Sequence, residues 1–332
     1  MTTLLSSITF LIASVIPQNY KYEKKELIAS GENIVFKMKS EGIVITGSYE
    51  VEFDNLSYNP SDDSDIKKGD IITEVDGEKV LSINELTSYI NSVNRSIVIL
   101  TINRNNNIIK RTLKIVRINN LVRTGLYVKD RVLGVGTLTF IDPTTSFYGA
   151  LGHEIIDSDV KTSKYLNEGS LYYNDVISIK KGENGKPGEK ITNTEMKDSI
   201  GKVNINTNMG IFGRLKSYSS KYIYPMNTKN NIRLDKAYIL TCIKGKEVKP
   251  YEIEIVSLKE QNIDDTKGIT FKITDKELLS ISGGVYSGMS GSPIIQNDHI
   301  IGAVTHVIVN DIQYGYGLYI ENMYNKMIKS LK

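Results

Sequence analysis

The seven residues Ser287–Pro293 constrain this chain more tightly than any other stretch. They read Ser-Gly-Met-Ser-Gly-Ser-Pro, and the apolar pair Ile294-Ile295 follows them directly. The glycines beside Ser290 allow backbone conformations that other residues avoid and let a substrate approach closely. A turn of this kind can also direct backbone N–H groups at one point, where they stabilise a developing oxyanion. The stretch predicts either an exposed nucleophilic serine or an ordinary Gly/Ser/Pro turn before a strand.

Length and composition limit the classes of protein that the chain can belong to. Its 332 residues are enough for two domains. A net charge of +3, with no dense Lys/Arg patch, argues against a nucleic-acid partner. The single cysteine, Cys242, lies in an apolar run, so the sequence predicts a small buried side chain and no internal disulfide or cysteine-rich zinc site. We expect no metal and no organic cofactor.

The N-terminus carries an uncharged and mostly apolar segment at residues 4–17. The segment is shorter than the ~20 residues that a helix needs to span a bilayer. Its length suits the apolar part of an export signal, although no Lys or Arg precedes it and no clear small-x-small cleavage site follows. We expect residues 1–30 to be an export signal or short membrane anchor, and the alternative is a buried N-terminal helix or strand.

Residues 31–118 are predicted to form a small α+β domain. A strand is expected at 42–47, and a short apolar strand at 69–77 ends in an Asp-Gly turn suited to a hairpin. A capping box at Ser82–Glu85 starts a helix whose apolar residues recur at helical spacing. Two β-branched strands follow, at 97–102 and 108–116.

This order of elements resembles a PDZ domain. Such domains bind an extended peptide or a C-terminus by adding it to the edge of a sheet. The resemblance implies that Gly42, Ile43 and Val44 bind the peptide. The alternative is a generic α+β domain without a ligand.

Residues 119–332 are predicted to be mainly β. Short strands separated by Gly/Asn turns, with little helical periodicity, favour a barrel or sandwich. The region has room for two small barrels packed together, with a closing helix at 320–331.

A nucleophilic serine needs a base, and the chain offers three histidines. His299 lies in a polar turn, whereas His306 lies in an apolar strand and either belongs to the core or lines a cleft. His153 follows Gly149-Ala150-Leu151-Gly152. We favour His153, because a base early in the chain and a nucleophile late in it is the order of chymotrypsin. The alternative for His153 is a structural turn.

The turn around Ser290 resembles the nucleophile turn of chymotrypsin-like serine proteases. That resemblance implies that Ser290 is the nucleophile and that the N–H groups of Gly288 and Ser290 form the oxyanion hole. Together with the segments Gly-Thr-Leu-Thr-Phe (136–140) and Tyr-Gly-Ala-Leu-Gly-His (148–153), the chain resembles the SpoIVB family of serine peptidases from spore-forming bacteria. The resemblance implies a chymotrypsin-like double β-barrel at 119–332, preceded by the PDZ domain.

The same resemblance assigns the acid of the triad to Asp275, which would orient the imidazole and stabilise its charged form. Chymotrypsin-like enzymes usually place the acid nearer the base, so Asp157, Asp159 and Asp175 remain alternatives. Asp275 could instead cap a helix or turn. Met289 stands where chymotrypsin carries an aspartate that pairs with a newly cut N-terminus, so that activation switch is not expected.

The resemblance also implies a function. The protein would be a serine endopeptidase exported from the forespore into the space between the two spore membranes and held to the membrane by its N-terminus. It would cleave a membrane-bound inhibitor of a sigma-factor-processing protease, and also itself. Its PDZ domain would bind a peptide, its own chain included. Two alternatives are an HtrA-like quality-control protease, which places the PDZ domain after the protease, and a non-catalytic PDZ adaptor on a degenerate protease fold.

Overall fold

The computed structural model describes residues 25–331, apart from 120, 164, 194, 219–221 and 261–264. Most of the predicted export or anchor segment at 1–30 lies outside the described residues, and its last part forms strand β1 (Glu26–Ala29). Among the helices that are described, none has the length and apolar character needed to cross a membrane.

Six antiparallel strands close into a first barrel, because β11 (Leu126–Ile141) pairs with β12 (Phe147–Ala150) on one side and with β2 (Asn33–Ser48) on the other. Ile34, Leu138, Tyr148 and Ile211 are among the side chains that fill it. Strands β1 and β18 (Ile223–Pro225) extend the sheet beyond β11. In ring order the strands are β11 (Leu126–Ile141), β12 (Phe147–Ala150), β17 (Gly210–Leu215), β16 (Gly201–Thr207), β13 (Leu166–Tyr173) and β2 (Asn33–Ser48).

A second closed barrel follows in the chain. Buried and more exposed residues alternate along β20 (Val248–Leu258), as expected for a strand with one face toward a core. The core includes Ile239, Ile253 and Phe271. In ring order the strands are β19 (Lys236–Cys242), β20 (Val248–Leu258), β21 (Ile269–Ile273), β25 (Tyr314–Tyr319), β24 (His299–Val307) and β23 (Pro293–Gln296).

The C-terminal helix α4 (Ile320–Leu331) joins the two barrels. Its buried residues Ile320, Met323 and Met327 recur every three to four positions and therefore share one face. That face packs in a cluster with Phe140 of the first barrel and Leu318 of the second. The predicted mainly β fold with a chymotrypsin-like double barrel is confirmed.

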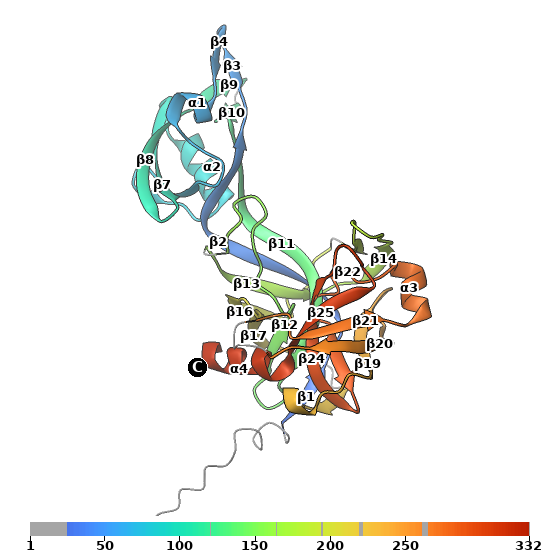
Figure 1. Ribbon diagram of the computed structural model, residues 1–332. Coiled ribbons are helices and arrows are strands. Elements are labelled where there is room, and N and C mark those ends of the chain that lie inside the picture. The colour runs from blue at the N-terminus through green and yellow to red at the C-terminus, as the bar shows by residue number, and fades with distance from the viewer. Residues whose placement is uncertain are drawn as a thin grey trace, which may run out of the picture.

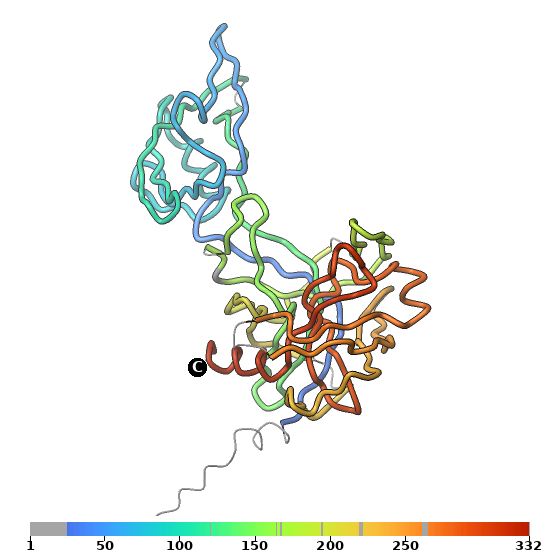
Figure 2. Tube along the Cα trace, viewed as in Figure 1, coloured from blue at the N-terminus to red at the C-terminus, as the bar shows by residue number. Residues whose placement is uncertain are grey.

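A third, smaller body stands away from the barrels at the far ends of β2 and β11, which run side by side from one body to the other (Figures 1 and 2). We call residues 42–128 the α/β module. Its helix α2 (Ile83–Ser92) begins at the predicted capping box, where Ser82 accepts a hydrogen bond from the Glu85 N–H. Its other elements are β3 (Val51–Phe53), β4 (Leu56–Tyr58), α1 (Pro60–Ser64), β5 (Ile71–Val75), β6 (Glu78–Lys79), α2 (Ile83–Ser92), β7 (Ile97–Arg104), β8 (Asn107–Lys114), β9 (Val116–Ile118) and β10 (Leu121–Arg123).

The predicted boundaries of the small domain, 31–118, differ from the structure at both ends. The first half of β2 lies in the first barrel, where Val35 pairs with Val135 on one side and Tyr172 on the other. At the other end, the first residues of β11 complete the sheet of the module, with Leu126 beside Ser48. One continuous strand crosses the two bodies, and Gly42 at the border lies within that strand and not in a turn, so the sequence pattern does not reveal the border.

A small sheet beside the second barrel leads into the predicted nucleophile turn. It consists of β14 (Val176–Lys180), β15 (Gly188–Thr192) and β22 (Tyr286–Ser287), with β15 parallel to β22. The helix α3 (Lys276–Ser282) precedes β22, and a short 3-10 turn, η2 (Lys229–Asn231), precedes the second barrel.

Candidate active site

The predicted nucleophile turn connects β22 to β23 at the junction of the two barrels. Gly288 and Gly291 both take left-handed backbone conformations, with φ of 95° and 93°. A Cβ on Gly291 would lie 2.1 Å from the carbonyl oxygen of Thr137 and 2.5 Å from the nitrogen of Leu151. Only glycine fits there, and its close approach places the turn directly against the loop that carries His153.

Ser290 is half-buried in this turn, and its hydroxyl donates a hydrogen bond to the carbonyl oxygen of Thr305, 3.0 Å away. Among the described residues, no acceptor is bonded to the Ser290 N–H. The carbonyl of Gly288 is turned toward the hydroxyl of Thr137, which donates to it at 3.0 Å. The serine is therefore held in a rigid turn, with its own N–H available to a developing oxyanion.

His153 lies beside this turn, at the end of a loop in which Leu151 and Gly152 both have φ of 70°. Its Nδ1 is 2.9 Å from the carbonyl oxygen of Glu154. A carbonyl only accepts hydrogen bonds, so Nδ1 carries the proton and Nε2 is left to accept one. Burial lowers the pKa of His153, and the bond to Glu154 offsets this only in part. The imidazole is thus neutral near pH 7 and in the tautomer that a general base requires.

His306 is the second imidazole at the site. Its ring centroid lies 5.4 Å from that of His153, and the residue directly follows Thr305. Desolvation, with smaller contributions from His153 and Lys267, lowers the pKa of His306 to about 4. His299 belongs to the hairpin at the other end of β24, where its Nδ1 contacts the carbonyl of Asn297. The structure therefore brings His153, His306 and Ser290 together and leaves His299 outside.

Asp275 does not lie at this site, which contradicts its prediction as the acid of the triad. It is the N-cap of α3, where its carboxylate accepts from the N–H of Leu278 at 2.9 Å and from that of Glu252 at 3.4 Å. Thr270 pairs with Tyr316, which in turn pairs with His306, and Asp275 is five residues beyond Thr270. At ~3.3 Å per residue, this places Asp275 about 16 Å along the strand direction from His306.

The alternative acids Asp157, Asp175 and Asp159 also form ion pairs with lysines, away from His153. Asp157 is fully buried and lies 2.7 Å from the ammonium of Lys129. Burial raises the pKa of Asp157, but hydrogen bonds from Lys129 and others outweigh it and hold this pKa below its usual value. Asp175 is exposed and forms an ion pair with Lys246 at 3.5 Å.

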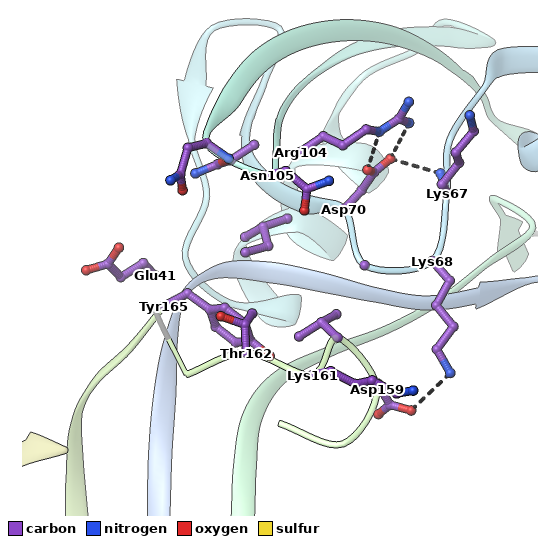
Figure 3. Close-up of a pocket in the computed structure, with 15 residues that line it drawn as sticks. Glu41, Lys67, Lys68, Asp70, Arg104, Asn105, Asp159, Lys161, Thr162 and Tyr165 are labelled. Atoms are coloured by element: carbon purple, nitrogen blue, oxygen red, sulfur yellow. Dashed lines mark hydrogen bonds and ion pairs between the residues drawn. The ribbon is translucent and has the colours of Figure 1, made fainter. Parts of the chain in front are cut away.

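Asp159 joins the first barrel to the α/β module. It pairs with Lys129 and, at 3.3 Å, with Lys68 of the module. Figure 3 shows the ion pair of Lys68 and Asp159 on the wall of a cavity of about 590 Å³ between the first barrel and the module. Within the part of the chain that the structure describes, no carboxylate is hydrogen-bonded to His153, and the Glu154 carbonyl holds its Nδ1 instead.

Thr137 is a further residue of the site, and the sequence predicts no role for it. Its N–H donates to the carbonyl of Ser290 at 2.9 Å, and its carbonyl accepts from the N–H of Leu151 at 3.2 Å. Its hydroxyl donates to the carbonyl of Gly288. Thr137 thus ties the nucleophile turn to the His153 loop, and a hydroxyl in a buried strand gives no sequence signal of such a role.

The prediction that Gly42, Ile43 and Val44 bind a peptide is wrong in this structure. Ile43 and Val44 pair with Ile72 and Ile71 of β5 on one side, and Val44 pairs with Lys129 of β11 on the other. A Cβ on Gly42 would lie 2.5 Å from the carbonyl oxygen of Ile72. Because both edges of this segment are covered, it has no free edge to which a peptide could add.

Comparison with known proteins agrees with this geometry. A family model described as SpoIVB peptidase S55 matches residues 120–324, a range that includes His153, Thr137 and Ser290. A search of curated proteins found no match.

Proposed function

Because the chain belongs to the SpoIVB family of serine peptidases, we propose that it is an endopeptidase of sporulation signalling in which Ser290 is the nucleophile and His153 the base. The observation that carries this assignment is the meeting of three groups: a serine hydroxyl in a glycine turn, an imidazole with Nε2 free to accept, and an unbonded Ser290 N–H. The geometry supplies a nucleophile, a proton acceptor and one oxyanion donor.

The proposed reaction follows from these groups. The Ser290 oxygen attacks the carbonyl carbon of the scissile bond while its proton passes to Nε2 of His153, and negative charge gathers on the carbonyl oxygen near the Ser290 N–H. The C–N bond then breaks, and His153 gives the proton to the leaving amine. Water hydrolyses the acyl ester in a second cycle of the same proton transfers. In the structure the hydroxyl is bonded to Thr305, so it must first rotate toward His153.

Among the described residues, the group that holds Nδ1 of His153 is the Glu154 carbonyl rather than a carboxylate, and this affects the expected rate. The Glu154 carbonyl fixes the tautomer, but it carries only a partial charge and stabilises an imidazolium less than an aspartate would. We therefore expect a slow peptidase. Slow turnover is compatible with an enzyme that acts on a single regulatory substrate.

The substrate and location remain proposals that rest on membership of the family. The substrate would be a membrane-associated regulator of a sigma-factor-processing protease, cleaved in the space between the forespore membranes, and the enzyme would also cut itself. The uncharged apolar segment at residues 4–17 supports an attachment at the membrane before such a cut.

The α/β module offers a different peptide site from the one predicted. Leu126 and Val128 of β11 pair with β2 on one edge only, and α2 lies along the other. A groove of about 130 Å³ runs between them, lined by apolar residues that include Ile83, Leu86 and Ile90. We infer that an extended peptide with an apolar side chain adds to this edge of β11, because strand addition satisfies its backbone while the groove takes the side chain.

The test of the proposed activity uses a proteome-derived peptide library, with the newly formed N-termini identified by mass spectrometry. The wild type is expected to produce new N-termini that are absent with Ser290→Ala and present with Ser287→Ala, a change at an exposed serine of the same turn. Equal cleavage by the wild type and Ser290→Ala would contradict the proposal.

A further inference from the structure

Lys190 of β15 is a charged side chain buried behind the nucleophile turn. The residue is 3% exposed, and within the described chain no carboxylate lies within ion-pair distance of it. Its ammonium contacts the Thr137 hydroxyl at 3.5 Å and the ring of Tyr286, whose centroid is 5.9 Å away. Burying an ammonium without a counter-charge is costly, and an apolar side chain of similar length would be more stable there. Its position therefore calls for a role other than packing.

The groups around Lys190 leave its charge uncompensated. The titratable groups that face it are the thiol of Cys242 on β19 and the phenol of Tyr286 on β22, and burial raises the pKa of both, so that both are neutral near pH 7. Burial lowers the pKa of Lys190 to about 8. The ammonium is therefore still mostly charged at pH 7.

The stem of Lys190 is packed against the nucleophile turn itself. A Cβ on Gly288 would lie 2.9 Å from the Cβ of Lys190. The ammonium donates to the Thr137 hydroxyl, and that hydroxyl donates to the Gly288 carbonyl at 3.0 Å. The hydroxyl of Ser292 also reaches Thr137, at 3.5 Å. Met289 gives the turn no carboxylate, and this chain of donors is a side-chain link that holds the turn from behind, in addition to its backbone hydrogen bonds.

We propose that Lys190 is a positioning residue of the peptidase: its buried ammonium polarises the Thr137 hydroxyl, which keeps the Gly288 carbonyl turned away from the cleft. With the carbonyls of Gly288 and Ser290 both tied to Thr137, the peptide unit between Met289 and Ser290 lies between two fixed units. Its N–H, the oxyanion donor, then stays directed at the substrate. The positive charge behind the turn also favours the developing oxyanion.

This inference depends on Ser290 being the proposed nucleophile, and its test uses a fluorophosphonate probe, whose phosphoryl oxygen enters the oxyanion hole. Lys190→Met keeps the length of the side chain and removes the charge. Because an oxyanion donor contributes ~10²–10³-fold and Lys190 acts through it, we expect the maximal rate of labelling to fall about 10- to 100-fold. The half-saturating probe concentration should change less than twofold.

Two readouts separate positioning from packing. Lys190→Met should melt at the same temperature as the wild type or higher, since the buried charge is gone, whereas loss of mere packing would lower both stability and rate. The wild-type rate should also fall as the pH rises through about 8, where Lys190 loses its proton, and this limb should vanish in Lys190→Met. Lys180→Met, at an exposed position of neighbouring β14, is the matched control. It should change neither the melting temperature nor the pH dependence of the labelling rate.

Thr137→Val is the second variant, because it leaves Lys190 in place and removes the hydroxyl link. It should show the same loss of labelling rate. The double variant, Lys190→Met with Thr137→Val, should be labelled only slightly more slowly than either single variant. Full labelling rates in a folded Lys190→Met, or in Thr137→Val, would overturn the role of Lys190 while leaving the proposed peptidase intact. If the wild type were not labelled at Ser290, the proposed active site would fail as well.

Discussion

The Ser290 hydroxyl donates its hydrogen bond to the carbonyl oxygen of Thr305, 3.0 Å away. A carbonyl holds a hydroxyl in place but cannot take its proton, so this contact describes a nucleophile at rest. The residue after Thr305 is His306, whose ring contacts that of His153. Rotation of the Ser290 side chain therefore moves its hydroxyl from the Thr305 carbonyl to the proposed base, His153. We expect substrate binding to drive that rotation.

Asp275→Asn should leave the activity within about threefold of the wild type. Asn and Asp cap helices equally well, so the free energy of unfolding should also be unchanged, whereas Asp275→Ala should lower it by about 1 kcal/mol. Peptidase assays and denaturant unfolding of both variants check this. An orienting acid behaves differently, since replacing one by Asn lowers kcat about 10⁴-fold. A loss of that size in Asp275→Asn would show that the acid moves to His153 in the working enzyme.

Asp157→Asn should destabilise the protein, because it leaves the Lys129 ammonium half-buried beside a neutral amide. We expect a cost of about 2 kcal/mol, below that of breaking a fully buried pair, since Lys129 is partly exposed and keeps Asp159. Chemical denaturation at pH 7 measures it. Asp175→Asn, in an exposed ion pair, is the control and should cost less than 0.5 kcal/mol or so.

The same measurement repeated against pH gives the sign of the effect. The folded-state pKa of Asp157 is held below its ordinary value, so the ion pair stabilises the protein above that ordinary value. This contribution is lost as the pH falls through the folded-state pKa, and Asp157→Asn should abolish that part of the acid sensitivity. An unchanged acid profile would contradict the assignment.

His306 should make the fold sensitive to mild acid. Its pKa is about 4 in the folded protein against an ordinary 6.5, so the unfolded chain binds a proton more readily over that interval. Stability from this group is then complete above pH 6.5 and declines modestly as the pH falls toward 4, because His306 is exposed and solvent screens part of the effect. His306→Asn should flatten the decline in thermal melts, while His299→Asn, at the far end of the same strand, should leave it as steep as in the wild type.

Thr87→Arg should block the groove beside β11 without disturbing the core, because Thr87 is exposed and lines that groove. The probe is a phage library of random C-terminal nonapeptides. We expect the wild type and Ser88→Arg, at an exposed neighbouring position, to enrich apolar sequences and Thr87→Arg to enrich none. Equal enrichment by Thr87→Arg would exclude this groove as the peptide site.

The sequence pattern predicts the fold well, because helix caps, strand alternation and glycine turns each depend on a few neighbouring residues. The capping box at Ser82, the alternating strands and the glycine turn around Ser290 each act over a few residues. The sequence does not reveal the border of the small domain, since β2 runs through both bodies as one continuous strand with Gly42 inside it. The peptide site was misplaced for the same reason, as the edge of β2 is covered by Lys129 and its neighbours from far along the chain.

At the candidate site, the residues in glycine-rich turns were predictable and their partners were not. Ser290 and His153 stand in unusual turns, whereas Thr137 and Lys190 are ordinary strand residues. They come together behind the turn only through tertiary packing, Thr137 from β11 of the first barrel and Lys190 from β15 of the small sheet beside the second. The resemblance points to Asp275 as the acid, but Asp275 is the N-cap of α3. Aspartate is common both as a helix cap and as a catalytic acid, so the residue type alone does not separate the two roles.

The measurement that tests the account most directly is the labelling of the protein by a fluorophosphonate, with the modified peptide identified by mass spectrometry. Wild type, Ser290→Ala and His153→Ala are compared. The account predicts a label on Ser290 in the wild type, none in Ser290→Ala and a much slower reaction in His153→Ala. No label on the wild type, even with a groove-binding peptide present, would contradict the proposed active site and favour a non-catalytic role for the fold.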